Sequence, residues 1–169
     1  MKRLILVVLL IFLFSPQASA ALKLNEPAPL FTLHDVNEKE FSLGDIVGAG
    51  STKKGNGVIV SFFASWCGPC REELPIMNSL VNEFRSKGIT VVLIDVKESL
   101  ATVKALLKEL QVDQPIVLRD ADGKTGEKYQ LRFLPTTFFV GADGKLKDVI
   151  YGELKSASQL QAGAEKLLK

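Results

Sequence analysis

The stretch VIVSFFASWCGPCREELP, residues 58–75, decides how this chain is interpreted. Residues 58–64 are mostly β-branched or aromatic, which is typical of a buried strand. Cys67 and Cys70 follow, and they are the only cysteines among the 169 residues. From Cys70 to Phe84, apolar residues recur every three or four positions, which predicts one face of a helix. The stretch therefore predicts a strand, a turn that carries two cysteines, and a helix.

Similar patterns continue on the C-terminal side. Apolar and turn residues predict a buried strand, an amphipathic helix, a short strand or turn, a short helix, a hairpin around Asp143-Gly144 and a closing helix with a serine cap. In that order, these elements span residues 88–96, 100–110, 115–120, 126–131, 136–152 and 156–168. On the N-terminal side, residues 24–35 and 39–46 predict two short strands that form a hairpin at a sheet edge.

The order of these elements predicts the fold class. A strand-helix-strand crossover implies parallel strands, whereas a hairpin implies an antiparallel pair. We therefore predict an α/β three-layer sandwich with a mixed central sheet and an N-terminal β-hairpin extension. Residues 21–169 are long enough to form one ordinary domain with its own core.

The first 20 residues predict a signal peptide. Lys2 and Arg3 precede an apolar run of eleven residues, Leu4 to Phe14, and Ala18-Ser19-Ala20 fits a cleavage site. The run is shorter than the roughly 20 residues of a membrane-spanning helix. We predict cleavage after Ala20 and a periplasmic domain; an uncleaved membrane anchor is the alternative.

The charge balance argues against two classes of partner. Two of the 21 basic residues lie in the signal segment and none of the 19 acidic ones, so the remainder carries equal numbers of both. A neutral domain has no electrostatic reason to bind nucleic acid or an anionic membrane. We therefore expect no nucleic-acid partner, and we expect a monomer.

The two cysteines have three candidate roles. A disulfide across two residues closes too short a loop to stabilise the fold much, so a structural staple is poorly placed. A zinc site needs about four ligands, and the chain offers only His34 besides the cysteines. We expect no cofactor and no metal, although copper held by the cysteines and His34 stays an alternative.

Redox chemistry is the third role. Cys67 stands where the strand ends and the helix begins, so free backbone N–H groups and the helix dipole stabilise its thiolate. Cys70 lies one turn later, on the apolar face, and is expected to point inward. Cys67 is therefore the predicted nucleophile, and Cys70 the residue that resolves the mixed disulfide.

Several neighbours contribute to this candidate site. Pro69 fits a first helical turn, Gly68 leaves Cys67 open to a partner, and Trp66 is expected to be a partly exposed platform. Glu73 lies three residues after Cys70, and it is either a solvated helix residue or a desolvated proton shuttle. Spacing alone does not decide between these two interpretations.

The motifs FFASWCGPCREELP and LPTTFFV together resemble the TlpA/ResA-like branch of the thioredoxin superfamily, which are exported bacterial thiol-disulfide oxidoreductases. The resemblance implies a thioredoxin-like fold and assigns catalytic roles to Cys67, Cys70, Glu73 and a cis Pro135. It implies that the chain around Pro135 faces the substrate, through Leu134 and Thr136. It also implies substrates such as disulfide-bearing apocytochrome c or copper-centre assembly proteins, and a membrane electron donor of thiol-reducing type. Many members of this branch keep a membrane anchor, which this chain is expected to lose.

The leading hypothesis is a periplasmic protein-disulfide reductase. The alternatives are an oxidase that forms disulfides, a thiol peroxidase and a copper-binding chaperone. The peroxidase alternative lacks the expected Pro-Thr-Cys pocket, because no PxxxTxxC sequence occurs.

Overall fold

The computed structural model describes residues 22–53 and 55–169. The predicted signal peptide, residues 1–20, lies outside these residues. Within them, seven strands form one sheet in the order β2-β1-β5-β4-β3-β6-β7. The strands are β1 (Thr32–Asp35), β2 (Glu40–Ser42), β3 (Gly57–Phe63), β4 (Ile89–Val96), β5 (Ile116–Asp120), β6 (Thr136–Gly141) and β7 (Leu146–Tyr151).

The sheet is mixed, as the sequence predicts. β3 pairs in parallel with β4, and β4 with β5, whereas the remaining pairs are antiparallel. β3 lies between β4 and β6, and every one of its residues is buried. The predicted N-terminal hairpin is β1 and β2, and it extends the sheet at one edge.

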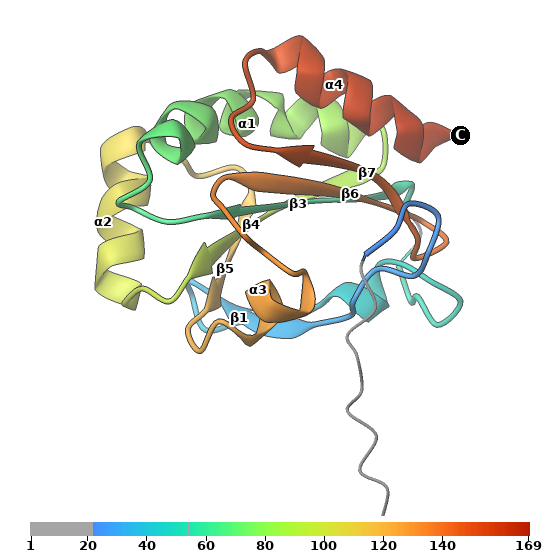
Figure 1. The fold of residues 1–169 in the computed structure, drawn as a ribbon, viewed down its shortest axis with the longest axis horizontal. Coiled ribbons are helices and arrows are strands. Elements are labelled where there is room, and N and C mark those ends of the chain that lie inside the picture. Colours follow the sequence, from blue (N-terminus) through green and yellow to red (C-terminus); the bar gives the residue numbers. More distant parts are fainter. Residues whose placement is uncertain (1–21, 54) are drawn as a thin grey trace, which may run out of the picture.

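Helices α1 (Gly68–Ser86), α2 (Leu100–Leu110) and α4 (Ala157–Glu165) pack on one face of the sheet. The other face is covered by the N-terminal segment and the short α3 (Lys124–Lys128) (Figure 1). Each face has its own apolar core, and the strands contribute alternate residues to the two. The predicted three-layer sandwich is confirmed. Within the described residues, no helix has the length and apolar character needed to cross a membrane.

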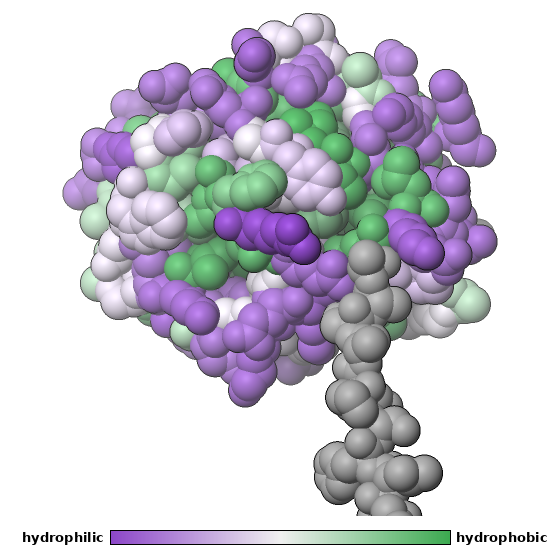
Figure 2. All heavy atoms as spheres, in the orientation of Figure 1, coloured by the Kyte–Doolittle hydropathy of each residue, from purple (hydrophilic) through white to green (hydrophobic). Residues whose placement is uncertain are grey.

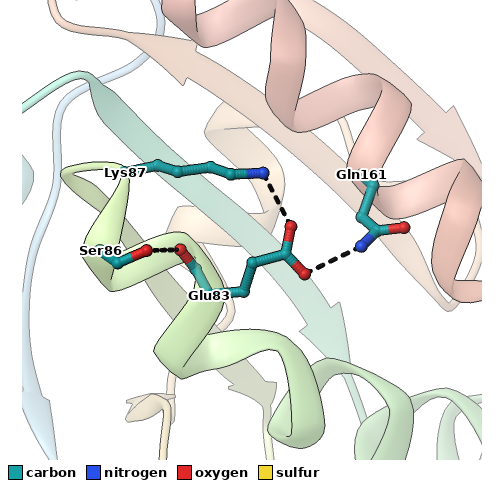
Figure 3. A network of polar contacts seen from close by, with 4 residues as sticks. All are labelled: Glu83, Ser86, Lys87 and Gln161. Carbon is teal, nitrogen blue, oxygen red and sulfur yellow. Dashed lines mark hydrogen bonds and ion pairs between the residues drawn. The ribbon is translucent and has the colours of Figure 1, made fainter.

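Polar contacts tie the C-terminal part of α1 to α4. The Glu83 carboxylate accepts a hydrogen bond from Gln161 Nε2 at 2.8 Å and forms an ion pair with Lys87 Nζ at 2.7 Å (Figure 3). Ser86 Oγ donates to the Glu83 backbone carbonyl at 2.7 Å. These contacts hold the end of α1 that is remote from the cysteines.

Several boundaries differ from the sequence prediction. The strand predicted over residues 24–35 is confined to β1, and that predicted over 39–46 to β2, which is followed by a 3-10 turn, η1 (Leu43–Asp45). The short helix predicted over residues 126–131 spans Lys124–Lys128, because the Asp120 carboxylate accepts the Thr125 and Gly126 backbone N–H groups and caps its start. The closing helix, predicted to reach residue 168, ends at Glu165 and continues as a 3-10 turn, η2 (Lys166–Leu168). Residues 115–120, left open between strand and turn, contain the strand β5 (Ile116–Asp120).

Candidate active site

The two cysteines lie at the junction that the sequence predicts. Cys67 is the N-cap residue of α1, and its Sγ accepts a hydrogen bond from Cys70 N at 3.2 Å. Cys67 N in turn donates to the Ala64 carbonyl at 3.2 Å, which closes the turn after β3. The two sulfurs form a disulfide with an S–S distance of 2.06 Å. Because Sγ of Cys67 faces the helix N-terminus, negative charge on this sulfur is stabilised when the disulfide opens.

Exposure distinguishes the residues around the disulfide. Trp66 is 74% exposed, and Gly68 and Pro69 are exposed as well. Cys67 is 5% exposed and Cys70 is 1% exposed. Cys67 is therefore less accessible to a partner than expected from the neighbouring Gly68, because only a small part of it is exposed. Cys70 is shielded from solvent. Pro69 occupies the first turn of α1, as its missing N–H group predicts.

The strand register brings Pro135 to the same end of the sheet as the cysteines. Phe62 of β3 pairs with Thr136 of β6, so the chain that enters β6 lies beside the chain that leaves β3. The Leu134–Pro135 peptide bond is cis, as the family resemblance implies. Leu134 is partly buried and packs against the core that contains both cysteines.

The side chain of Thr136, a residue that the resemblance implies faces a substrate, is turned inward. The residue is 2% exposed, and its hydroxyl donates to the Phe133 carbonyl at 2.9 Å. A substrate contact through the Thr136 backbone stays a prediction. Thr136 is the first residue of β6. Successive side chains of a strand point to opposite faces of the sheet, so the direction of the Thr136 side chain depends on the register of the whole strand.

Glu73 is buried rather than solvated, at 2% exposure. Leu154 N donates to Oε2 at 3.0 Å, and Ser61 Oγ donates to Oε1 at 3.1 Å. Thr137 Oγ1 lies 3.5 Å from Oε1. Burial raises the pKa of Glu73 above its ordinary value of 4.5, and these hydrogen bonds oppose the rise. A buried carboxylate with a raised pKa, one turn after Cys70, is suited to exchange a proton with the Cys70 thiol.

His34, the possible third copper ligand, is exposed on β1, three strands away from β3 in the sheet. The three candidate ligands are therefore not brought together. Within residues 22–53 and 55–169, no three histidine, cysteine, aspartate or glutamate side chains gather as a metal site requires.

Sequence reasoning missed a second acidic group at the site. The Glu98 carboxylate accepts hydrogen bonds from Ser65 N and Ser65 Oγ, each at 2.6 Å. Asp95, at the end of β4, is fully buried and accepts a hydrogen bond from Glu98 N at 3.3 Å. An aspartate within the apolar run of β4 was the available signal.

An exposed aromatic pair was also missed. Phe133 and Tyr151 are 52% and 65% exposed, and their rings meet edge to face with centroids 5.8 Å apart. They line a hollow of about 380 Å³ together with Tyr129 and Arg132. Figure 2 shows apolar surface gathered near the middle of the face that carries the segment between α3 and β6. Phe133 directly precedes the Leu134–Pro135 bond, so apolar surface adjoins the redox site.

Comparison with known proteins identifies the family. Residues 24–149 match the AhpC/TSA family. The thiol-disulfide oxidoreductase ResA of Bacillus subtilis is 36% identical over 127 residues, which are 75% of this chain and 66% of that protein. This chain belongs to the AhpC/TSA family, as a ResA-like member. ResA of Bacillus cereus strain ZK is 31% identical over 146 residues, 86% of this chain and 79% of that protein.

A solved structure supports the same assignment. A thiol:disulfide interchange protein of the thioredoxin family from Chlorobium tepidum superposes with a TM-score of 0.72 at 30% identity. The match covers 89% of this chain and all of that one. The ResA-like chain thus has a thioredoxin-like fold, and it is an oxidoreductase that acts on disulfides by dithiol-disulfide exchange.

Proposed function

We propose that the protein is exported to the periplasm and reduces disulfides in other exported proteins. The observation that carries this proposal is the disulfide of Cys67 and Cys70 at the N-terminus of α1, with Trp66 and the cis Pro135 segment beside it. The signal-peptide pattern of residues 1–20 supports the location. Apocytochrome c and copper-centre assembly proteins are the proposed clients.

The reduced form carries two electrons to the client. The Cys67 thiolate attacks one sulfur of the client disulfide, and the other client sulfur leaves as a thiolate. Glu73 accepts the proton of the Cys70 thiol, and Cys70 then attacks Cys67 Sγ. The second client sulfur leaves, and the Cys67–Cys70 disulfide forms again. A membrane protein with a reduced dithiol is the proposed donor that restores the enzyme.

The carboxylates around the site favour the direction of reduction. Glu73 and Glu98 are acidic groups close to the cysteines, and negative charge disfavours a neighbouring thiolate. A dithiol whose thiolate is not strongly stabilised is the stronger reductant. A midpoint potential above that of glutathione would instead favour the oxidase.

The clients are identified by trapping. Without its resolving thiol, the Cys70→Ala variant is expected to hold its client in a mixed disulfide, and mass spectrometry of the trapped complex names the client. The matched Cys67→Ala variant is expected to trap none. More trapping by Cys67→Ala than by Cys70→Ala would reverse the roles of the two thiols.

The family name gives one reason to test a peroxidase as a second function. The peroxidase alternative rests on the match of residues 24–149 to the AhpC/TSA family. Turnover of hydrogen peroxide by Cys70→Ala would support it. We expect none, because the disulfide partner of Cys67 is only three residues away and the peroxidase motif is missing.

A further inference from the structure

The turn that leads into the cysteine motif is bound to a carboxylate. Both hydrogen-bond donors of Ser65, its backbone N–H and its hydroxyl, are directed to Glu98, one to each carboxylate oxygen. Two bonds of 2.6 Å hold this carboxylate firmly against the turn, because hydrogen bonds to a charged group are short and strong. Ser65 precedes Cys67 by two residues, so the charge of Glu98 is fixed close to the nucleophile.

A second carboxyl group, that of Asp95, lies next to Glu98. Asp95 is fully buried; its Oδ2 accepts a hydrogen bond from Glu98 N, and its Oδ1 has no partner within the described part of the chain. An ionised Asp95 would leave a buried charged oxygen without a donor, which is costly. Burial, followed by the contact with Glu98, raises the pKa of Asp95 to about 7. Below this pH, Asp95 is mostly protonated and uncharged.

Arg119 of β5 is a charged group on a neighbouring element that acts on Asp95: it lowers the pKa of Asp95, but by less than burial and Glu98 raise it. Arg119 pairs in register with Asp95, but it also lies 3.7 Å from the Glu38 carboxylate. Asp120, the next residue of β5, is bound to the N–H groups at the start of α3. From β3, the register partner of Asp95 is Phe63, which is uncharged. The pair therefore presents net negative charge to the turn.

The distance is short enough for this charge to matter. Two residues of extended chain span at most about 7 Å, so Glu98 lies within roughly one Debye length of Cys67. At about 10 Å and an effective dielectric constant of about 20, one charge changes a thiolate equilibrium by roughly tenfold. The effect opposes the stabilisation that the helix N-terminus provides.

We propose that Glu98, through its attachment to Ser65, lowers the fraction of Cys67 that is present as thiolate, and that Asp95 strengthens this effect when it loses its proton. The inference deepens the proposed function, because it rests on Cys67 as the nucleophile. Glu98 and Asp95 are positioning residues here, since they act on the sulfur through the turn. They make the dithiol a stronger reductant.

The test measures how fast iodoacetamide alkylates Cys67 of the reduced protein as a function of pH. Mass spectrometry identifies the alkylated cysteine. Glu98→Gln is expected to react roughly tenfold faster near neutral pH, and its midpoint potential is expected to be less reducing. Asp95→Asn is expected to match the wild type below pH 6 (about one unit under the Asp95 pKa of about 7) and to react faster above pH 8. Ser65→Ala keeps both charges but removes one of the two hydrogen bonds that hold Glu98 at the turn. The alkylation rate of Cys67 is therefore expected to rise, by less than in Glu98→Gln.

The control is Glu40→Gln, which removes an exposed carboxylate from β2 at the far edge of the sheet and is expected to change nothing. Circular dichroism confirms that each variant is folded. Wild-type pH profiles and potentials in folded Glu98→Gln and Ser65→Ala would overturn the inference. Alkylation needs no client, so this failure is distinct from failure of the proposed function, which would appear as absence of insulin reduction by the wild type.

Discussion

Glu73 is the residue whose environment differs most from what its neighbours in the sequence suggest. Glu72 beside it is exposed, whereas Glu73 is buried and bonded to groups from β3 and from the segment before α4. Burial that raises its pKa leaves the carboxylate ready to take up a proton during the reaction. This combination is suited to the step in which Cys70 must lose its proton.

Replacing Glu73 by glutamine should slow resolution of the mixed disulfide. The amide cannot accept the proton of Cys70, so we expect a rate about a hundredfold lower near neutral pH. In the wild type, the rate should rise as Glu73 ionises, at a pH above its ordinary pKa of 4.5. In Glu73→Gln, the rate should rise only when the Cys70 thiol itself ionises. Stopped-flow kinetics with a small disulfide measures both profiles.

Glu72→Gln is the matched control, because it removes an equal charge from the adjacent position of the same helix. It should leave the resolution rate and its pH profile unchanged. Equal profiles in Glu73→Gln and Glu72→Gln would show that Glu73 has only a structural role.

Asp95 should make the stability of the oxidised protein depend on pH. The unfolded chain releases this proton near the ordinary pKa of 3.8, whereas the folded protein keeps it up to about 7. The folded state therefore binds more protons within this window, and the free energy of unfolding should fall as the pH rises through it, by on the order of 4 kcal/mol. Urea unfolding at a series of pH values measures the slope.

Asp95→Asn should remove most of that slope and should be the more stable protein above pH 7, since asparagine has no proton to lose. Glu73 adds a slope of the same sign, so part of it will remain. An unchanged slope in Asp95→Asn would mean that Asp95 is already ionised in the folded protein.

Among the elements, α4 is packed tightly against the sheet. Gly163 lies on its buried face, and a Cβ atom at this position would come within 3 Å of three ring atoms of Phe139. Phe139 belongs to β6 and is fully buried, so its ring cannot move aside. Glycine therefore allows α4 to lie close to β6, the strand that follows the cis Pro135.

Gly163→Ala should destabilise the protein although alanine favours helices. Overpacking a fixed core costs about 1–3 kcal/mol, and the gain in helix propensity is about 1 kcal/mol. We expect a net loss of about 1–2 kcal/mol in urea unfolding. Gly50→Ala, where a Cβ atom meets nothing within 4 Å, should change stability by less than about 0.5 kcal/mol. A Gly163→Ala protein as stable as Gly50→Ala would contradict this packing.

At the scale of the whole molecule, the disulfide is expected to contribute little to the fold. Two apolar cores, one on each face of the sheet, hold together the strands and helices of the described part of the chain. A bond between residues three positions apart closes a very short loop. The enzyme can therefore cycle between its two redox states without unfolding.

Reduction of the disulfide should lower the free energy of unfolding by roughly 2 kcal/mol or less, against nearly 5 kcal/mol for a bond that closes a loop of about 100 residues. Unfolding should stay cooperative in both states. Urea unfolding with and without reductant, monitored by circular dichroism, provides the comparison. A reduced protein that is unfolded without urea would show that the disulfide is a structural staple.

Much of the molecule follows from the sequence by itself. The period of the apolar residues predicts the strands, the helix after the cysteines and the hairpin around Asp143-Gly144, because local side-chain spacing determines which face of an element is buried. The position of Cys67 at a strand-helix junction predicts its place at the N-terminus of α1. These features depend on neighbours within a few residues, so they can be read along the chain.

The tertiary structure alone decided the environment of the acidic side chains. Ser61, Thr137 and Leu154 reach Glu73 from three segments, and Ser65 meets Glu98 from 33 positions away. Strand order and register bring these groups together, and both depend on the packing of the entire sheet. Burial of a carboxylate is a property of that packing, which is why the sequence left the role of Glu73 undecided and did not reveal Asp95 and Glu98.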